Sequence, residues 1–141
     1  MKKTYHGSCH CGAVRFEADL DLAAGTTRCN CSFCAKARWW MAFAVEGEFR
    51  LLAGADALAD YQHTKAKSGE AFLHFQFCRH CGFRPFTAGG PLPVFGDKPF
   101  HAINLACLDD ASPEELLSGP IHYADGLHDD WPATAAETRH L

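Results

Sequence analysis

The stretch Cys29-Asn30-Cys31-Ser32-Phe33-Cys34 organises the rest of this sequence, because it places three thiols within six residues. A Cys-x-Cys pair, Cys9 and Cys11, precedes it, and a Cys-x-x-Cys pair, Cys78 and Cys81, follows it. Seven of the eight cysteines therefore have spacings that are typical of metal ligands. Four thiols can complete one tetrahedral site, and the other three leave a second site one ligand short.

The spacing of the two outer pairs predicts one complete metal site. Zinc prefers four ligands in a tetrahedron, with thiolate sulfurs about 2.3 Å away. Cys9, Cys11, Cys78 and Cys81 would supply four thiolates from opposite ends of the fold. A zinc held there would be structural, and much of the folding free energy would depend on it. Spacing alone also permits another partition, in which Cys34 joins Cys78 and Cys81.

The central cluster, Cys29, Cys31 and Cys34, is predicted to hold a second zinc with an open fourth position. Water, a substrate or a protein group, such as one of the nine histidines, would fill that position. Three thiolates leave the metal with a formal negative charge, so it activates water weakly and suits a soft thiolate better. Metal binding lowers the pKa of a thiol. The ligand set therefore favours a thiol substrate, with these three cysteines as the catalytic centre.

Length and composition predict one globular domain. The chain has 141 residues, of which 48% are hydrophobic, and a domain usually takes ~100–200 residues. Its net charge of -4 argues against nucleic acid as a partner. It has neither an apolar leader segment nor the ~18 consecutive apolar residues of a membrane span. We therefore expect a cytoplasmic protein without a membrane partner, where clustered cysteines bind metal rather than form disulfides.

Short apolar runs separated by turns predict an all-β domain of two or more small antiparallel sheets packed face to face. A Ser-Pro-Glu-Glu sequence at residues 112–115 predicts a short helix with a capping box, ending near residue 119. The expected strands are residues 14–20, 39–45, 49–52, 58–63, 73–77, 101–105 and 121–123. The other expected segments are a helical turn at 32–36, loops at 65–69 and 88–99, and an unpatterned tail at 132–141.

The ordered cysteine motifs resemble those of the glutathione-dependent formaldehyde-activating enzyme family, which shares its domain with centromere protein V. The resemblance lies in GSCHCGAVRF at residues 7–16, CNCSFC at 29–34 and FCRHCG at 77–82. Residues 104–110 and 120–131 are also similar. It implies a zinc-binding domain over residues 5–131 and a C-terminal tail at 132–141.

The resemblance implies an Mss4-like β fold with two zincs and a carbon–sulfur lyase type of activity. The structural zinc would bind Cys9, Cys11, Cys78 and Cys81, and the catalytic zinc would bind Cys29, Cys31 and Cys34. The implied reaction is the addition of glutathione to formaldehyde, which gives S-hydroxymethylglutathione. In this family picture the thiol binds the second zinc.

Glutathione carries two carboxylates, so its pocket should offer cations. Lys36 and Arg38 follow the central cluster directly and are the predicted substrate-binding residues, with Arg84 as a weaker candidate. A second hypothesis is a non-catalytic, zinc-stabilised binding module of the same fold. A thiol-redox enzyme similar to methionine sulfoxide reductases ranks last, because only Cys107 lies outside the clusters and its flanks do not match that family's motif.

Overall fold

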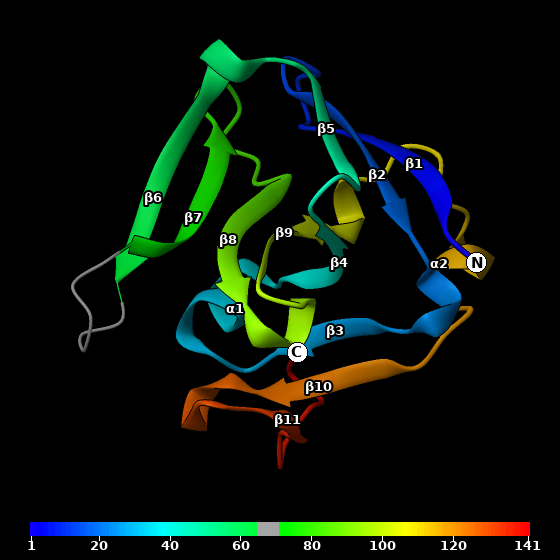
Figure 1. Cartoon of the computed structure of the whole chain (residues 1–141), viewed down its shortest axis with the longest axis vertical. Helices are drawn as coiled ribbons and strands as arrows, with labels where there is room; N and C mark the ends of the chain where they lie inside the picture. The colour runs from blue at the N-terminus through cyan, green and yellow to red at the C-terminus, as the bar shows by residue number, and fades with distance from the viewer. Residues whose placement is uncertain (65–70) are drawn as a thin grey trace.

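The computed structural model describes residues 1–64 and 71–141, and this part of the chain is mostly β (Figure 1). It contains eleven strands in two sheets and two short α-helices, which confirms the all-β prediction. The smaller sheet has the order β1-β2-β5, and the larger has the order β11-β10-β3-β4-β9-β8-β7-β6. The loop expected at residues 65–69 lies outside the described residues.

The helices are α1 (Ser32–Ala37) and α2 (Pro113–Leu116). The strands are β1 (Lys3–Ser8), β2 (Arg15–Leu20), β3 (Thr26–Cys29), β4 (Trp40–Val45), β5 (Phe49–Ala53), β6 (Leu58–Thr64), β7 (Ala71–Cys78), β8 (Phe86–Leu92), β9 (Lys98–Asn104), β10 (Ile121–Asp125) and β11 (Asp130–Thr134).

One hydrophobic core lies between the small sheet and one face of the large sheet. Strand β2 alternates as its sequence predicts, and it buries Phe16, Ala18 and Leu20. The Phe16 ring centroid lies 5.6 Å from that of Phe86 in β8. The Phe49 ring of β5 also contacts Phe86, at 4.7 Å. These aromatic contacts fix the small sheet, and the turn that follows β1, against the large sheet.

A second core lies on the opposite face of the large sheet and positions α1. Trp39, Met41, Phe100 and Ala102 are buried in it. The Phe33 ring of α1 stacks on Phe75 of β7 with their centroids 3.6 Å apart. This packing fixes the helix, and with it the central cysteines, against the sheet.

The prediction of a loop at residues 88–99 is wrong, because most of that segment belongs to β8 and β9. Gly89 pairs with both Leu73 and Phe100 across the sheet. An added Cβ at Gly89 would lie 2.6 Å from Leu73 Cδ2 and 2.9 Å from Phe100 Cζ. Side chains of the two neighbouring strands therefore fill the space that a side chain at Gly89 would need. Backbone pairing needs no side chain, so the strand shows no apolar alternation.

Two further features differ from the expectation at the C-terminal side. Strand β10 pairs in parallel with β3, because the chain returns past α2 and starts the pairing at the same end, where Thr26 N donates to Pro120 O at 2.9 Å. The expected boundary after Trp131 falls inside β11. Ala135, in the expected tail, is buried, and its N–H donates to Tyr123 O at 2.8 Å. Strand β11 is mostly exposed and contains Pro132, so its sequence shows no apolar alternation.

Helix α2 has the capping box that its sequence predicts, although it ends at Leu116. Ser112 Oγ accepts from Glu115 N at 3.2 Å, and Glu115 Oε2 accepts from Ser112 N at 2.9 Å. In the described ranges, neither α-helix has the length and apolar character needed to cross a membrane.

Candidate metal centres and an adjoining groove

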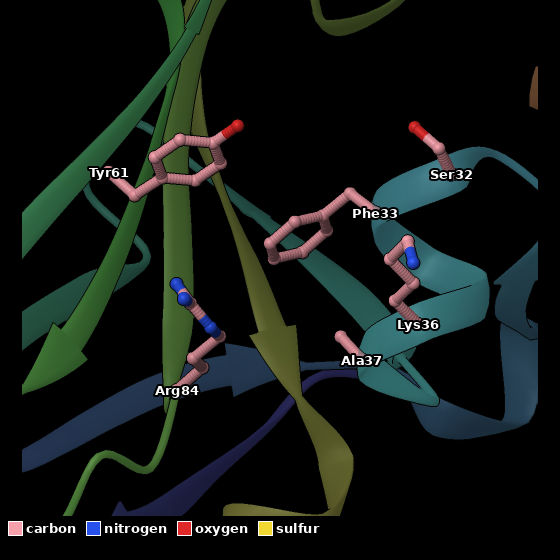
Figure 2. A pocket seen from close by; sticks show the side chains of 6 residues that line it. All are labelled: Ser32, Phe33, Lys36, Ala37, Tyr61 and Arg84. Carbon is pink, nitrogen blue, oxygen red and sulfur yellow. The ribbon is translucent and has the colours of Figure 1, made fainter.

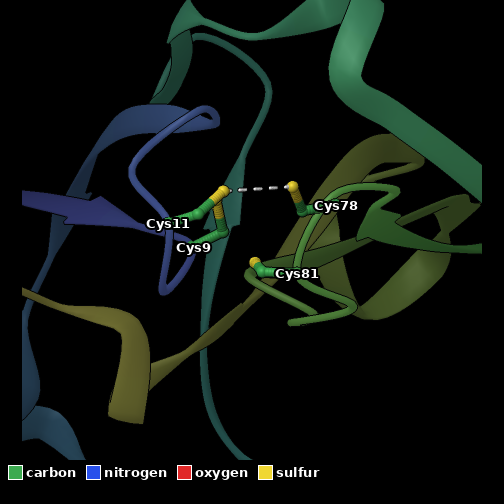
Figure 3. Close-up of side chains that lie close together, drawn as sticks. All are labelled: Cys9, Cys11, Cys78 and Cys81. Atoms are coloured by element: carbon green, nitrogen blue, oxygen red, sulfur yellow. Dashed lines mark hydrogen bonds between the residues drawn. The ribbon is translucent and has the colours of Figure 1, made fainter.

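Four cysteines from two distant turns bring their sulfurs together (Figure 3). Cys9 and Cys11 follow β1, while Cys78 ends β7 and Cys81 closes the next turn. The Cys11 sulfur lies 3.6 Å from that of Cys9 and 3.7 Å from that of Cys78. Tetrahedral thiolates about 2.3 Å from a zinc would place their sulfurs about 3.8 Å apart. The sulfur positions therefore fit one four-coordinate metal.

The backbone of both turns is arranged to support thiolates. Gly12 and Gly82 have nearly equal positive φ angles, 77° and 76°, which glycine adopts without strain. The Val14 N–H donates to the Cys9 sulfur at 3.3 Å. The pKa of Cys81 is lowered to about 6, first by the backbone N–H of Cys11 and then by that of Phe83. Backbone N–H groups in both knuckles thus donate to cysteine sulfurs, and in the second knuckle they favour the thiolate of Cys81 before any metal binds.

The other three predicted ligands form a second cluster around the start of α1. Cys29 ends β3, Cys31 is the N-cap of α1, and Cys34 lies in its first turn. Their sulfurs all lie within 4.8 Å of one another. The Cys31 N–H donates to the Cys29 sulfur at 3.2 Å, and the Cys34 N–H donates to the Cys31 sulfur at 3.4 Å. The alternative that joined Cys34 to the other cluster is wrong.

The three thiols cannot all ionise on their own at neutral pH. Hydrogen bonds from Cys29, and then from Cys34, hold the pKa of Cys31 far below its usual range. The hydrogen bond to Cys31 raises the pKa of Cys29 to about 11, and those to Cys29 and Cys31 raise that of Cys34 as well. A divalent cation would displace the remaining protons and hold all three as thiolates.

This cluster has no fourth protein ligand within residues 1–64 and 71–141. Its members within the 4.8 Å limit are three cysteines, with no histidine, aspartate or glutamate among the described residues. The histidine considered from the sequence as a closing ligand is therefore not found there. Three sulfurs suit a metal site with one position left for another molecule.

A loop that the sequence analysis missed covers one side of the three-cysteine cluster. It is the 3-10 segment η5 (Gly126–His128) between β10 and β11. An added Cβ on Gly126 would lie 2.6 Å from the Cys29 sulfur. The Asn30 amide donates to Asp125 Oδ1 at 2.8 Å, and Asn30 Oδ1 accepts from Leu127 N at 2.9 Å. The one feature of the sequence that could have indicated this loop is Asn30, a polar residue between the predicted ligands Cys29 and Cys31.

A groove of about 410 Å³ lies on another side of α1 (Figure 2). The helix contributes Lys36 to it, and Tyr61 and Arg84 come from the opposite wall. Arg84 was the weaker candidate from the sequence. The groove is lined by Ser32, Phe33, Lys36, Ala37, Tyr61 and Arg84.

Arg38, the other predicted substrate residue, lies away from this groove. It caps α1 in a left-handed conformation with φ 53°. Its Nη1 donates to the His140 carbonyl at 2.6 Å. It lines a narrow crevice with Cys29 and Cys34 that leaves no room for a water molecule. The two cations expected to act together therefore lie beside different spaces.

Comparison with known proteins connects these clusters to a described family. The family model of the glutathione-dependent formaldehyde-activating enzyme matches residues 4–120. A crystal structure of a Rhodobacter sphaeroides protein is similar in fold, with a TM-score of 0.63. It is 31% identical, and the match covers 82% of this chain and 98% of that one. The family match includes both cysteine clusters and the lining of the groove, and it ends before the loop at Gly126.

Proposed function

The chain belongs to the glutathione-dependent formaldehyde-activating enzyme family, and from this premise we propose that it is a zinc-dependent carbon–sulfur lyase-type enzyme. In the proposed reaction, the sulfur of glutathione forms a bond to the carbon of formaldehyde. The C=O π bond breaks, and the thiol proton ends on the former carbonyl oxygen. The observation that supports this proposal most directly is the cluster of three sulfurs without a fourth ligand among the described residues.

The two cysteine clusters have different proposed roles because they hold different numbers of ligands. Cys9, Cys11, Cys78 and Cys81 would hold a structural zinc in a closed site. Cys29, Cys31 and Cys34 would hold the second zinc. When bound there, zinc supplies a cation that keeps a thiol deprotonated near neutral pH.

The chain's own groups prepare the three-cysteine cluster for such a substrate. Cys29 and Cys34 are buried, and Cys31 is half-buried, so bulk water has little access to the sulfurs. The backbone N–H groups of Cys31 and Cys34 orient two of the sulfurs. The loop at Gly126 closes one side, which leaves approach from elsewhere. A cytoplasmic location belongs to the proposal, because a reducing environment keeps these cysteines and the thiol substrate reduced.

X-ray absorption at the zinc edge tests this proposal directly. Titration with glutathione should add a fourth sulfur to the second zinc and leave the four-sulfur site unchanged. The formation rate of the adduct, followed by NMR, should exceed the uncatalysed rate. Cys31→Ser should abolish both effects. Cys107→Ser is the control, since it makes the same substitution at a cysteine that belongs to neither cluster.

The competing hypothesis predicts a different result in the same measurement. A non-catalytic binding module would keep its metals in closed coordination and take up no sulfur at millimolar glutathione. That outcome, with both zincs present, would overturn the proposed enzyme activity.

A further inference from the structure

The groove beside α1 presents two cations that lack acidic partners. Among the residues that the structure describes, its lining contains Lys36 and Arg84 and no aspartate or glutamate. Within residues 1–64 and 71–141, neither cation forms an ion pair with a carboxylate, whereas Arg50, for example, pairs with Glu17 and Asp19. Two uncompensated positive charges therefore adjoin one space in a chain whose net charge is -4. Such a space attracts an anion.

Arg84 is held so that most of its donors remain available. It is half-buried, and its guanidinium lies 5.5 Å from the Phe33 ring centroid and 4.9 Å from that of Phe77. Its Nη1 donates to the Phe75 carbonyl at 3.2 Å. A guanidinium has five N–H donors. Within residues 1–64 and 71–141, the bond to the Phe75 carbonyl is the one hydrogen bond that the Arg84 guanidinium donates. A partly buried charge with free donors is stabilised by a carboxylate ligand.

The other groups of the groove suit a small organic ligand. The Phe33 and Tyr61 rings form apolar walls, and each stacks on Phe75. In Figure 2, Arg84 and Tyr61 lie on one side of the groove, while Phe33 and Lys36 extend from the helix on the opposite side. The hydroxyls of Ser32 and Tyr61 add neutral hydrogen-bonding groups. The combination fits a ligand with separated carboxylates on a partly apolar, peptide-like frame.

The groove also lies within reach of the three-cysteine cluster. Ser32, which lines the groove, is the residue directly after Cys31, and consecutive Cα atoms are about 3.8 Å apart. The half-buried Cys31 sulfur lies at the same end of α1. The groove therefore adjoins the start of α1, where the Cys31 sulfur also lies.

We propose that this groove binds the carboxylate groups of the thiol substrate, with Lys36 and Arg84 as the two cations. The inference rests on the proposed function for the identity of the ligand as a thiol. Arg38 is not one of the pair, because it does not line the groove but a different crevice, which leaves no room for a water molecule.

Calorimetry with S-methylglutathione on the zinc-loaded protein tests the groove separately from the metal. This probe keeps both carboxylates, but its sulfur carries a methyl group in place of the ionisable proton. Lys36→Gln and Arg84→Gln should each weaken its binding about tenfold, the usual loss for one charge-assisted hydrogen bond. Lys36→Glu should weaken it further, and binding should fall as salt is added. Two controls test whether Arg84→Gln acts through misfolding. Thermal unfolding of the variant measures its stability, and Arg84→Lys keeps the positive charge.

Two control variants make the result decisive. Lys98→Gln removes an exposed charge outside the groove and should leave binding unchanged. Arg38→Gln should also leave it unchanged. The groove assignment is overturned if Lys36→Gln and Arg84→Gln bind the probe like the parent protein, or if Arg38→Gln weakens binding and Arg84→Gln does not.

The groove and the proposed function can fail independently. If glutathione sulfur reaches the zinc but the groove variants bind S-methylglutathione normally, the groove assignment fails and the enzyme proposal stands. If the probe depends on Lys36 and Arg84 but no thiol reaches the zinc, the enzyme proposal fails and the groove remains a carboxylate site.

Discussion

The substitution Gly126→Ala tests whether the β10–β11 loop is part of the three-cysteine centre. The added Cβ would lie 2.6 Å from the Cys29 sulfur, 2.8 Å from a Trp131 ring carbon and 3.1 Å from Cys31 Cβ. Ordinary contact begins at 3.4 Å, so the sulfur or the loop must move by about 0.8 Å. The loop is held in place by the pairing of β10 with β3 and by two hydrogen bonds of Asn30, which donates to Asp125 and accepts from Leu127 N.

The expected magnitude follows from how little a metal site tolerates displacement. Ligand distances in a metal site vary by about 0.2 Å, which is well below the movement required. Overpacking of this kind costs about 1–3 kcal/mol. If that cost is paid when the metal binds, zinc affinity at the three-cysteine site falls roughly 5- to 150-fold. The four-cysteine site should keep its affinity, because Gly126 contacts none of its residues.

Competition with a chromophoric chelator measures both zinc affinities in one titration. Gly47→Ala is the matched control, because Gly47 has a positive φ of 88° but no atom within 4 Å of an added Cβ. The control should lower stability slightly through backbone strain and leave both affinities unchanged. The reasoning is refuted if Gly126→Ala binds two zincs with the parent affinities, or if both sites weaken equally.

The other predictions concern the cysteine ligands, the hydrogen bonds that hold the loop and the half-buried His101. Cys31→Ser should retain one zinc per chain and remain folded, whereas Cys78→Ser should lose the structural zinc and much of the thermal stability, as metal analysis and circular dichroism melts would show. Asn30→Ala should weaken zinc at the three-cysteine site about tenfold in the chelator assay, since two hydrogen bonds that hold the loop are lost; an unchanged affinity would contradict the proposed clamp. Burial lowers the pKa of His101 from 6.5 to about 4, so the unfolded chain binds this proton first as pH falls. The stability that depends on neutral His101 is intact above pH 6.5 and is lost progressively down to about pH 4, by roughly 3 kcal/mol at most. His101→Phe keeps the ring stacked on Phe49 and should reduce this loss in urea unfolding at pH 7 and 4.5. An equal loss in both proteins would exclude His101 as its source.

The strands that could be predicted are those that carry an apolar run or a regular apolar alternation in their own sequence. Strand β2 is one example, because Phe16, Ala18 and Leu20 face one core in regular alternation. Strand β8 escaped prediction because its glycines carry no such pattern and owe their pairing to neighbours on both sides. Strand β11 escaped because its residues are mostly exposed and include Pro132, so they form no apolar run or alternation.

The sequence by itself determined which neighbouring cysteines act together as metal ligands. Ligands two or three residues apart are brought together by a single turn, whose geometry depends on nearby residues such as Gly12 and Gly82. Only the tertiary structure decided what surrounds the three-cysteine cluster. Arg84 is far from Lys36 in the sequence, and Gly126 is far from Cys29, so their proximity depends on strand order and register across the large sheet. Those pairings arise from long-range packing, which local spacing does not encode.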